Sequence, residues 1–593
     1  MSDYRPPLRD IEFVLDQIVD IEGLLSYPDY AHVDRETVSG ALAEAGRFMS
    51  DLIAPTNRVG DEVGSVWEDG AVVTPEEFKK AWQAYVEAGW NAVSGPPEFG
   101  GHGFPKPVGF AVQEMFVTSN LALSLNPMLT GSAITLLKDH GSDELRTTYL
   151  EKLVTAEWSG TMVLTEPGAG SDLGALRAKA VPGKDGTWEL TGTKIFITWG
   201  DHDLTDNIIH LVLARVPDAP PGTKGISLFL VPKYLVDAEG RPADRNAVTC
   251  VSVEHKLGIH GSPTCVLAFE GATGYLIGEP NQGMRYMFTM MNQARVDVGL
   301  EGLGVAERSF QQAAGYAVER KQGRAVGAPK TEASPIVEHP DVRRMLMTMK
   351  ASTEAMRALL YDTIAAVDRS QHHPDEQART AAGDRASLLT PVAKAWCADL
   401  GVELTSIGIQ VHGGMGYVEE TGAAQHFRDS RITPIYEGTN GIQAIDLVMR
   451  KLPIDGGTVV HGYFAEMRGL TEGLVADRRL SRLANGYSEA IAALETATDW
   501  LLSKKDPNDV LAGATPFLRM FGTVAGGYYL AREALSAGEA LGNGDDPWFE
   551  AKIDTASFYL TQIMPQAAGL LSAVTGGADS LFAVAEEQLT APS

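Results

Sequence analysis

Three glycine-containing segments of the sequence carry side chains that can bind a ligand or transfer a proton. The first is residues 165–172 (TEPGAGSD). Its two glycines let backbone amides approach a ligand closely, and Thr165 and Ser171 add hydroxyl donors. Such a loop can hold the edge of a flat ring or a phosphate group. The alternative is a tight turn that leads into a strand.

The second segment is residues 410–417 (QVHGGMGY). Its paired glycines, Gly413 and Gly414, permit contact with a pyrophosphate through backbone N–H groups. The alternative is a helix C-cap followed by a loop, because glycine spacing alone is weak support for a binding site.

The third segment is residues 435–443 (IYEGTNGIQ), in which Glu437 lies between an aromatic residue and a glycine, just before an apolar helix expected from Ile442. Partial burial against Tyr436 and a bound ligand would raise the pKa of this carboxyl group toward the range of a general base. The alternative is an acidic residue that stabilises a helix N-terminus.

Composition limits the classes of function. A chain of 593 residues with 44% hydrophobic and 21% charged residues is ordinary for a globular protein and long enough for three or four domains. The net charge of −28 disfavours nucleic acid and anionic membrane surfaces as partners. An anionic ligand would therefore need a local cation.

Targeting and redox signals favour a cytoplasmic protein. The first ten residues carry charges where a secretory signal needs an apolar run, and no stretch approaches the roughly 20 apolar residues that span a bilayer. Cys250, Cys265 and Cys397 have no CxxC spacing and are interpreted as reduced core residues. His372 and His373 lie in a polar segment, and we expect no metal site there.

The elements that must position these segments change along the chain. Up to about residue 160 the pattern is helical; Thr74 is the expected N-cap of a helix that ends near Gly89. Residues 161–285 show short strand-like runs between turns, as in 194–198 (KIFIT), which is typical of a small all-β domain. Helical periodicity returns from 286 to 452, with polar interruptions expected around 323–338 and 369–384, and continues in an acidic module from 453 to 593.

Taken together and in this order, the TEPGAGSD, KIFIT, QVHGGMGY and YEGTNGIQ segments resemble those of the acyl-CoA dehydrogenase family over roughly residues 40–452. The resemblance implies an α+β multidomain fold. Its expected parts are an N-terminal extension (1–35), an N-terminal helical domain (36–160), a middle β-barrel (161–285), a C-terminal four-helix bundle (286–452) and an additional helical domain (453–593). The chain looks like the long branch of the family, which includes fatty-acyl-CoA dehydrogenases and 3-methylmercaptopropionyl-CoA dehydrogenases, and we favour the second group.

The resemblance also implies roles for individual residues. Glu437 matches the base that takes the α-proton of an acyl-CoA thioester while the β-hydrogen leaves as hydride to the N5 atom of FAD, which the family holds between barrel and bundle. Other positions match cofactor contacts: Leu164, Thr165, Gly170, Ser171, Phe196, Thr198, Arg320, Gln322, Gln410, Gly413, Gly414, Thr439 and Asn440. Positions that match substrate contacts are Ser171, Asn292, Arg295 and Gly438.

Several consequences follow from the resemblance. Arg320, Gln322 and the 410–414 segment match contacts to the cofactor of a neighbouring subunit, which implies a homodimer or a dimer of dimers. The expected electron acceptor is an electron-transfer flavoprotein. The alternatives are an acyl-CoA oxidase that uses oxygen, a DNA-associated and non-dehydrogenating branch that the acidic composition disfavours, and a structural helical scaffold without flavin.

Overall fold

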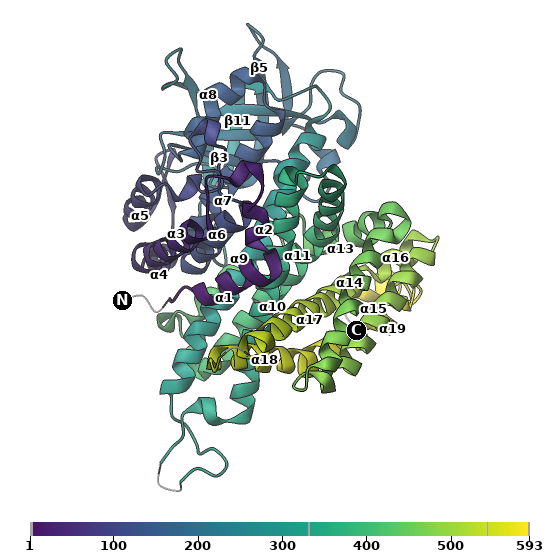
Figure 1. Ribbon diagram of the computed structural model, residues 1–593. Helices are drawn as coiled ribbons and strands as arrows, with labels where there is room; N and C mark the ends of the chain where they lie inside the picture. Colours follow the sequence, from purple (N-terminus) through teal and green to yellow (C-terminus); the bar gives the residue numbers. More distant parts are fainter. Residues whose placement is uncertain (1–3, 330–331, 543, 591–593) are drawn as a thin grey trace. The chain divides into compact units, whose positions relative to one another are not determined.

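The structure is a computed structural model that describes residues 4–329, 332–542 and 544–590 (Figure 1). The chain divides into two compact units. Unit 1 holds the residues up to Pro6 and His32–Asp297; unit 2 holds Pro7–Ala31 and the residues from Val298 onward. The terminal residues of the expected 1–35 and 453–593 segments, and Lys330 and Thr331 of the first expected polar interruption, lie outside the described residues.

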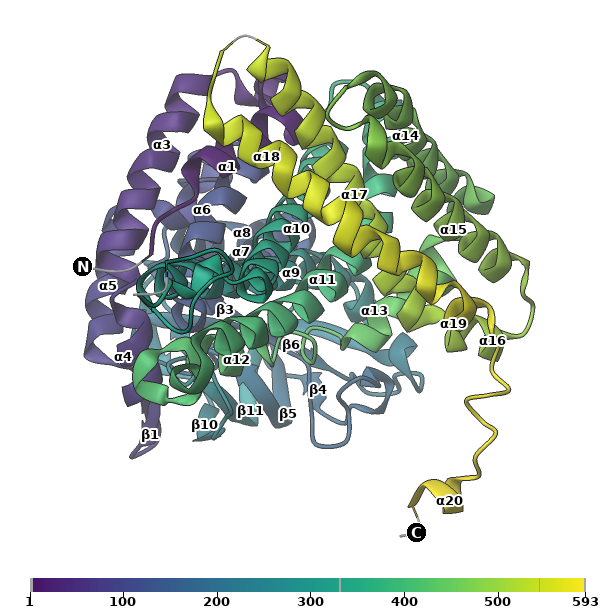
Figure 2. The same cartoon turned by 90° about the horizontal axis from the view of Figure 1, so that it is seen from below.

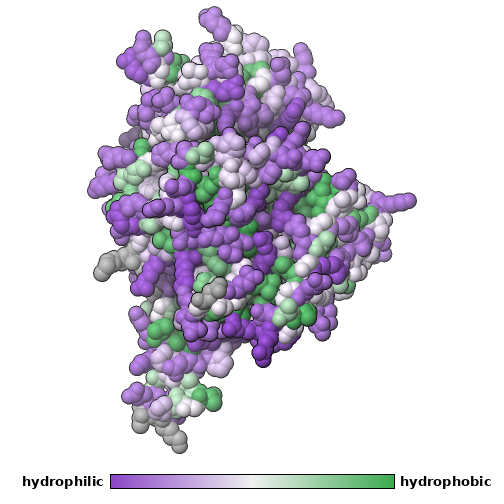
Figure 3. Space-filling model, viewed as in Figure 1, coloured by the Kyte–Doolittle hydropathy of each residue, from purple (hydrophilic) through white to green (hydrophobic). Residues whose placement is uncertain are grey.

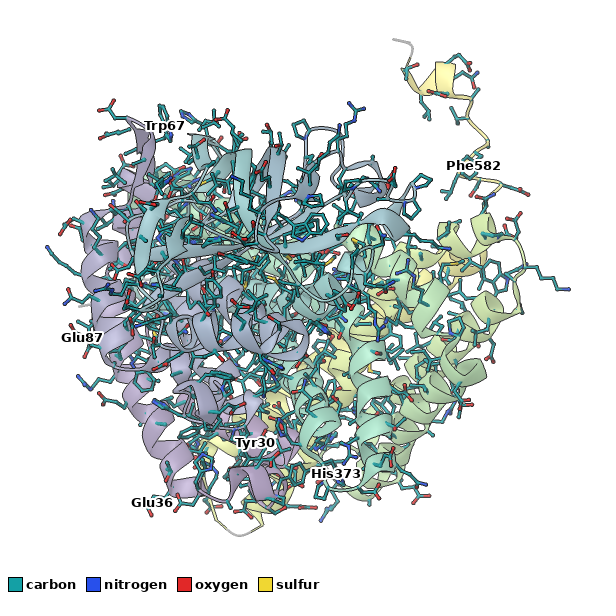
Figure 4. The ribbon with its side chains drawn as sticks, turned by 90° about the horizontal axis from the view of Figure 1, so that it is seen from above. Tyr30, Glu36, Trp67, Glu87, His373 and Phe582 are labelled. Carbon is teal, nitrogen blue, oxygen red and sulfur yellow. The ribbon has the colours of Figure 1, made fainter. Side chains whose placement is uncertain are left out.

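The N-terminal part of unit 1 is helical, as expected, with one β-hairpin. Its main helices are α3 (Arg35–Phe48), α4 (Thr56–Val63), α5 (Glu76–Glu87), α6 (Lys106–Ser119), α7 (Leu121–His140) and α8 (Asp143–Val154). The hairpin consists of β1 (Val66–Glu68) and β2 (Ala71–Val73), and Figure 4 shows Trp67 on it. Helices α6 and α7 are buried on nearly all sides, which explains their almost continuous apolar sequence.

The predicted start of α5 was partly wrong. Pro75, and not Thr74, occupies the N-cap position. The Thr74 hydroxyl donates instead to Asp203 Oδ1 at 2.6 Å, a residue far away in the sequence that local capping rules cannot detect. Phe78, Trp82 and Tyr85 form the buried apolar face of α5.

The rest of unit 1 contains a seven-stranded sheet (Figure 1). Its strands are β3 (Trp158–Val163), β4 (Lys179–Pro182), β5 (Trp188–Thr198), β6 (Asn207–Ala214), β7 (Ser227–Pro232), β10 (Val248–Val253) and β11 (Thr264–Leu276). The order is β3-β6-β7-β11-β5-β4, with β10 also paired to β11; only β3 and β6 are parallel. A separate pair is formed by β8 (Tyr234–Val236) and β9 (Pro242–Arg245).

The sheet confirms the predicted sheet domain but, among the described strands, it is not closed by a ladder between β3 and β4. One face buries a compact apolar core that includes Val163, Val212, Phe229 and Phe269. Cys250 and Cys265 are free and buried in this core. Cys397 is also free and buried, but it belongs to unit 2. Burial raises the pKa of the Cys265 thiol well above its ordinary value, with a further contribution from Cys250.

Helix α9 (Gly283–Glu319) passes from unit 1 into unit 2, where long helices form the core. These are α10 (Pro340–His372), which packs against α11 (Glu376–His412) and α17 (Ala514–Leu541). In unit 2, α9 lies very close to α11. A Cβ atom on Gly302 would come within 2.3 Å of Cys397 O, which leaves no room for a side chain. Glycine is therefore required for this helix contact.

The second expected polar interruption, 369–384, was largely wrong. Helix α10 extends to His372 and α11 begins at Glu376, so only residues 373–375 are outside the helices. The polar residues lie at the two helix ends, where Asp375 caps α11 by accepting the Ala378 N–H at 2.8 Å. His372 Nδ1 lies 2.6 Å from Asp29 Oδ2.

Unit 2 also contains the other α-helices of the described chain, and the expected 453–593 segment is helical, as predicted. They are α1 (Leu8–Val14), α2 (Ile21–Leu25), α12 (Ala423–Ser430), α13 (Asn440–Asp446), α14 (Thr458–Ala476), α15 (Ala484–Ser503), α16 (Pro507–Ala512), α18 (Pro547–Phe558), α19 (Leu571–Thr575) and α20 (Glu586–Thr590). Figure 2 shows α14 beside α15, and α20 at the end of an extended segment. Phe582 lies on that segment in Figure 4 and is exposed.

Hydrophilic residues predominate on the face shown in Figure 3, with hydrophobic residues scattered between them. No helix in the described parts of the chain is long and apolar enough to cross a bilayer.

Candidate active site

The TEPGAGSD loop of unit 1 follows β3 and is held in place by a buried ion pair. Lys194 Nζ, on β5, lies 2.8 Å from Glu166 Oε1 and donates to Leu164 O at 2.8 Å. Glu166 also accepts the backbone N–H groups of Arg177 and Ala178 at 2.6 and 3.0 Å. The Glu166–Lys194 pair thus connects β5 to the residue after β3, to the loop and to the residues before β4.

Electrostatics in this pair reflect burial and attraction. The Lys194 side chain is 0% exposed, and burial lowers its pKa to about 8, although Glu166 opposes this shift. Burial alone would raise the pKa of Glu166, but the Lys194 ammonium and the two backbone donors more than offset it, so the Glu166 pKa lies below its ordinary value.

Strand β5 contains a β-bulge that turns one aromatic side chain outward. Lys194 pairs with Leu267 and Ile197 with Cys265, so Ile195 and Phe196 together oppose a single residue of β11. Phe196 has φ +58°, which is uncommon for a bulky residue, and its side chain is 58% exposed. Bulges often re-aim a side chain next to a binding site. The bulge therefore presents an aromatic ring at the surface of unit 1.

The hydroxyl groups and open glycines near this ring can serve a ligand. Among the residues that the structure describes, the hydroxyls of Thr165 and Thr198 have no hydrogen-bond partner, and both residues are half-buried. A Cβ atom added to Gly170 would meet no atom within 4 Å. Leu164 is buried and Ser171 is exposed. An aromatic face, hydroxyl donors and an accessible backbone suit a flat ring system with polar edges, such as a flavin.

Asn292 and Arg295 lie on α9, as predicted, within the portion that belongs to unit 1. Asn292 is exposed, whereas Arg295 is only 6% exposed. Arg295 Nη1 donates to Asn292 Oδ1 at 3.3 Å, and its guanidinium lies 5.9 Å from the centre of the Phe288 ring. The Arg295 guanidinium is therefore buried, and it donates to the exposed residue Asn292.

The loop that carries Glu437 joins α12 to α13 in unit 2. Glu437 has φ +55° and Gly438 has φ +82°, so two successive residues adopt the left-handed conformation. For glutamate this conformation is unfavourable and persists only where the surroundings impose it. The Glu437 side chain is half-buried. A strained, partly buried carboxylate is a good candidate for a reactive group.

A buried lysine on α11 fixes this loop. Lys394 Nζ donates to Thr433 O at 2.8 Å and to Asn440 Oδ1 at 2.7 Å, on either side of Glu437. The Asn440 amide in turn donates to Asp399 Oδ1 at 2.7 Å and to Ala395 O at 3.0 Å. The Asn440 side chain thus binds protein groups, and a contact of this residue with a cofactor stays a prediction.

Gly438 and Thr439 are also engaged by the loop. Gln443 Nε2 donates to Gly438 O at 3.0 Å, and the Thr439 hydroxyl donates to Pro434 O at 3.3 Å. Helix α13 begins at Asn440, two residues before the predicted Ile442. The loop is thus rigid on both sides of the candidate base.

The QVHGGMGY segment lies at the C-terminus of α11. Gly413 has φ +62°, and a Cβ atom on Gly413 or Gly414 would meet no atom within 4 Å. Gln410 is exposed, and Tyr417 is 87% exposed. Both interpretations of this segment, a helix end and an accessible glycine surface, therefore apply.

His412 lies at this helix end, and His426 lies on α12. His412 Nδ1 lies 2.7 Å from Gly408 O, and His426 Nε2 lies 3.1 Å from Gln312 Oε1, so both histidines have structural contacts. Arg320 and Gln322 are exposed at the end of α9, where their backbone pairs with residues 334 and 336. The described residues contain no group of three acidic, histidine or cysteine side chains arranged to hold a metal.

The residues that hold these loops were not predicted as site residues: Lys194, Glu166 and Lys394. A lysine within an otherwise strand-like run, and another within the apolar pattern of α11, were the available signals. Each requires a buried partner, because an unpaired buried charge is very costly.

Four family models match in succession: the N-terminal domain of acyl-CoA dehydrogenase (42–157), its middle domain (161–272), its C-terminal domain (281–452), and an acetyl-CoA dehydrogenase C-terminal-like domain (463–585). The chain is 46% identical to the 3-methylmercaptopropionyl-CoA dehydrogenase of Ruegeria pomeroyi, covering 98% of this chain and 99% of that protein.

Two further comparisons extend the similarity. The broad-specificity linear acyl-CoA dehydrogenase FadE5 of Mycobacterium tuberculosis is 35% identical, covering 95% of this chain and 96% of that protein. A solved structure of an acyl-CoA dehydrogenase from Bacillus anthracis complexed with FAD has the same fold, with a TM-score of 0.73, 20% identity and coverage of 98% and 95% of the two chains.

Proposed function

This chain belongs to the acyl-CoA dehydrogenase family, and from that premise we propose that Glu437 removes the α-proton of an acyl-CoA thioester. The chain is an FAD-dependent acyl-CoA dehydrogenase, and its product is the trans-2-enoyl thioester under this proposal. The observation that carries the role of Glu437 is its conformation: a non-glycine residue held at φ +55° in a loop that Lys394 fixes on both sides.

The residues of unit 1 supply a surface that fits the cofactor. We assign the aromatic face of Phe196, the hydroxyls of Thr165 and Thr198, and the backbone near Gly170 to the flavin ring, because these groups are accessible. FAD supplies the acceptor for the β-hydride. Leu164 packs along the ring, and Ser171 contributes to the cofactor and the CoA arm.

The residues of unit 2 perform the proton transfer. An ordinary carboxylate is a far weaker base than the enolate it must generate, so the developing charge on the thioester oxygen has to be stabilised. We assign the backbone N–H of Glu437 to that oxygen, as in the family. The rigid loop supplies orientation, because it keeps the carboxylate from rotating away from the α-carbon.

Several assignments depend on the family resemblance. Asn292 and Arg295 are proposed to bind the CoA moiety together with Gly438, and Arg320, Gln322, Gln410, Gly413, Gly414 and Thr439 to contact the cofactor. The exposure of Gln410, Gly413 and Gly414 supports a contact to a second subunit, and hence a homodimer or a dimer of dimers. An electron-transfer flavoprotein is the proposed acceptor, and the three free cysteines support the cytoplasm as the location.

The predicted domain boundaries are kept as a proposal, including closure of the sheet domain (161–285) into a barrel. Two hydrogen bonds between the β4 region and the end of β6 support closure: Ala180 N–H to Arg215 O and Arg215 N–H to Ala178 O, both 2.9 Å. The helices between 286 and 452 are assigned to a four-helix bundle.

We propose a short thioester, 3-methylmercaptopropionyl-CoA, as the substrate. The greater identity to the Ruegeria pomeroyi enzyme than to FadE5, 46% against 35%, supports this choice. The test is anaerobic flavin bleaching by butanoyl-, palmitoyl- and 3-methylmercaptopropionyl-CoA. Fastest bleaching by the thioether ester is expected; faster bleaching by palmitoyl-CoA contradicts the assignment. Peroxide formation in air that outpaces reduction of an electron-transfer acceptor would instead indicate an oxidase.

A further inference from the structure

A buried glutamate on α9 contacts the residue next to the proposed base. The Tyr436 hydroxyl donates a hydrogen bond to Glu301 Oε2, and Glu301 is 0% exposed. Both residues belong to unit 2. Hydrogen bonds to a charged acceptor are stronger than those between neutral groups, particularly away from water.

The anchor for this hydrogen bond is itself immobile. Glu301 lies between Gly299 and Gly302, two positions at which α9 lies against α11. A Cβ atom at Gly299 would come within 2.6 Å of Ala393 O, so the two backbones are in close contact. Glu301 is therefore fixed relative to α11, the helix that also supplies Lys394.

The conformation of the loop explains what such an anchor does. Glu437 and Gly438 are both left-handed, and the strained glutamate relaxes unless the residues before and after it are held. Lys394 binds Asn440 after Glu437 and Thr433 O four positions before it. Directly before Glu437, the Tyr436 N–H makes a 3.2 Å bond to Ile432 O, and the Tyr436 side chain is bound to Glu301.

The donor in this contact stays protonated. Burial raises the pKa of the Tyr436 phenol well above its ordinary value, and the charge of Glu301 raises it further. The Tyr436 hydroxyl therefore keeps its proton and can donate it to Glu301.

We propose that Glu301 is a positioning residue for proton abstraction: by accepting the Tyr436 hydroxyl it holds the backbone turn that aims Glu437. This inference rests on the proposed function of Glu437. It requires Glu301 to act as an acceptor, so glutamine at this position is sufficient and leucine is not.

The test compares Y436F, E301L and E301Q with the wild-type holoenzyme by rapid anaerobic mixing with 3-methylmercaptopropionyl-CoA. A displacement of about 1 Å at a reacting group can cost about 10²-fold in rate, so Y436F and E301L should reduce their flavin about 10- to 100-fold more slowly at saturating ester. The ester concentration at half-maximal rate should stay within about threefold of wild type. E301Q should react within about threefold of wild type.

Two readouts distinguish positioning from a general loss of structure. The α-deuterated ester should show a larger isotope effect on flavin reduction in Y436F, because proton transfer becomes more limiting. In protein without ester, the amides of residues 432–443 should exchange with solvent faster in Y436F and E301L than in wild type and E301Q.

A matched control is available in the same unit. Tyr529 donates its hydroxyl to the buried Asp362 Oδ2 at 2.7 Å, so Y529F also removes a buried tyrosine–carboxylate hydrogen bond. Y529F should reduce its flavin at the wild-type rate. If Y436F and E301L slow the reaction no more than Y529F, or if E301Q is as slow as E301L, the positioning role is wrong.

Other outcomes would show that the proposed function of Glu437 is itself wrong. A wild-type flavin that no thioester bleaches, or an E437Q enzyme of full activity, overturns the proposed function and the role of Glu301 with it. Normal bleaching by wild type together with normal bleaching by Y436F overturns only the role of Glu301.

Discussion

Replacing Lys194 by methionine should loosen the sheet that carries the proposed flavin surface. The change removes the cation from a buried pair, in which the Lys194 and Glu166 side chains are 0% and 8% exposed. Breaking a buried ion pair by removing one partner typically costs about 3–5 kcal/mol, because the other charge is left in a poorly solvated site. Leu164 O also loses its donor.

The loss of stability in K194M should be large for a single substitution, but it should not unfold unit 1 completely. Glu166 keeps the N–H donors of Arg177 and Ala178, which stabilise its charge. The double variant E166Q/K194M is the matched control, because no buried charge remains. Arg177 and Ala178 donate to different oxygens of Glu166, so the glutamine oxygen can accept only one of these N–H groups. The double variant should therefore recover part of the loss.

Hydrogen exchange is the suitable assay, because a chain with two units need not unfold in a single step. Peptides that cover β3 and β5 should exchange about 10²- to 10⁴-fold faster in K194M, since each 1.4 kcal/mol of about 3–5 corresponds to a factor of about ten. FAD content should fall in parallel. Exchange in K194M within about fivefold of wild type would refute the reasoning that the pair holds the loop.

Three more predictions follow from buried groups. Lys552 Nζ lies 3.1 Å from Glu354, 2.7 Å from Glu533 and 3.0 Å from Asp10. Replacing this lysine by methionine (K552M) should destabilise unit 2 by about 3–5 kcal/mol near pH 7.5, as measured by hydrogen exchange of α17 and α18. The deficit should shrink near pH 5, because burial raises the Glu533 pKa to about 6 and its carboxyl group then takes up a proton. Burial lowers the pKa values of His202 and His210 to about 3, so below pH 6.5 the unfolded chain binds protons that the folded chain does not. The stability of unit 1 should therefore fall with decreasing pH below about 6.5, by about 1.4 kcal/mol per pH unit for each histidine. The H210Q variant should show half of that slope in denaturant titrations. K394M should keep its flavin but reduce it about 10- to 100-fold more slowly in rapid mixing with the ester, because the loop of Glu437 loses its attachment; an unchanged rate would contradict this role.

Much of the fold could be predicted because it is encoded locally. The alternation in β5, the apolar runs of β6 and β7 and the period of α5 identify their elements without tertiary information. The β1–β2 hairpin was missed because its three-residue strands are short and largely exposed, and so leave almost no hydrophobic pattern. The polar ends of α10 and α11 were misinterpreted as a loop because solvent-exposed helix ends and loops share the same composition.

The site could be predicted only in part, for a similar reason. Glu437, Phe196 and the glycines lie in contiguous motifs, but the residues that fix them are distant in sequence. Lys194 binds Glu166 across 28 positions, and Glu301 binds Tyr436 across 135. The left-handed conformation of Glu437 also has no local signal, because non-glycine residues rarely adopt it and tertiary contacts impose it here.

The role of Glu437 as the base is tested most directly by the flavin absorbance of wild type and E437Q after anaerobic mixing with 3-methylmercaptopropionyl-CoA. Glutamine preserves the shape of the side chain but cannot accept the α-proton. The wild-type flavin should bleach in a single turnover, and E437Q should bleach about 10²- to 10⁴-fold more slowly while retaining its FAD. An E437Q enzyme that bleaches within about threefold of the wild-type rate would contradict the assignment of Glu437 as the base.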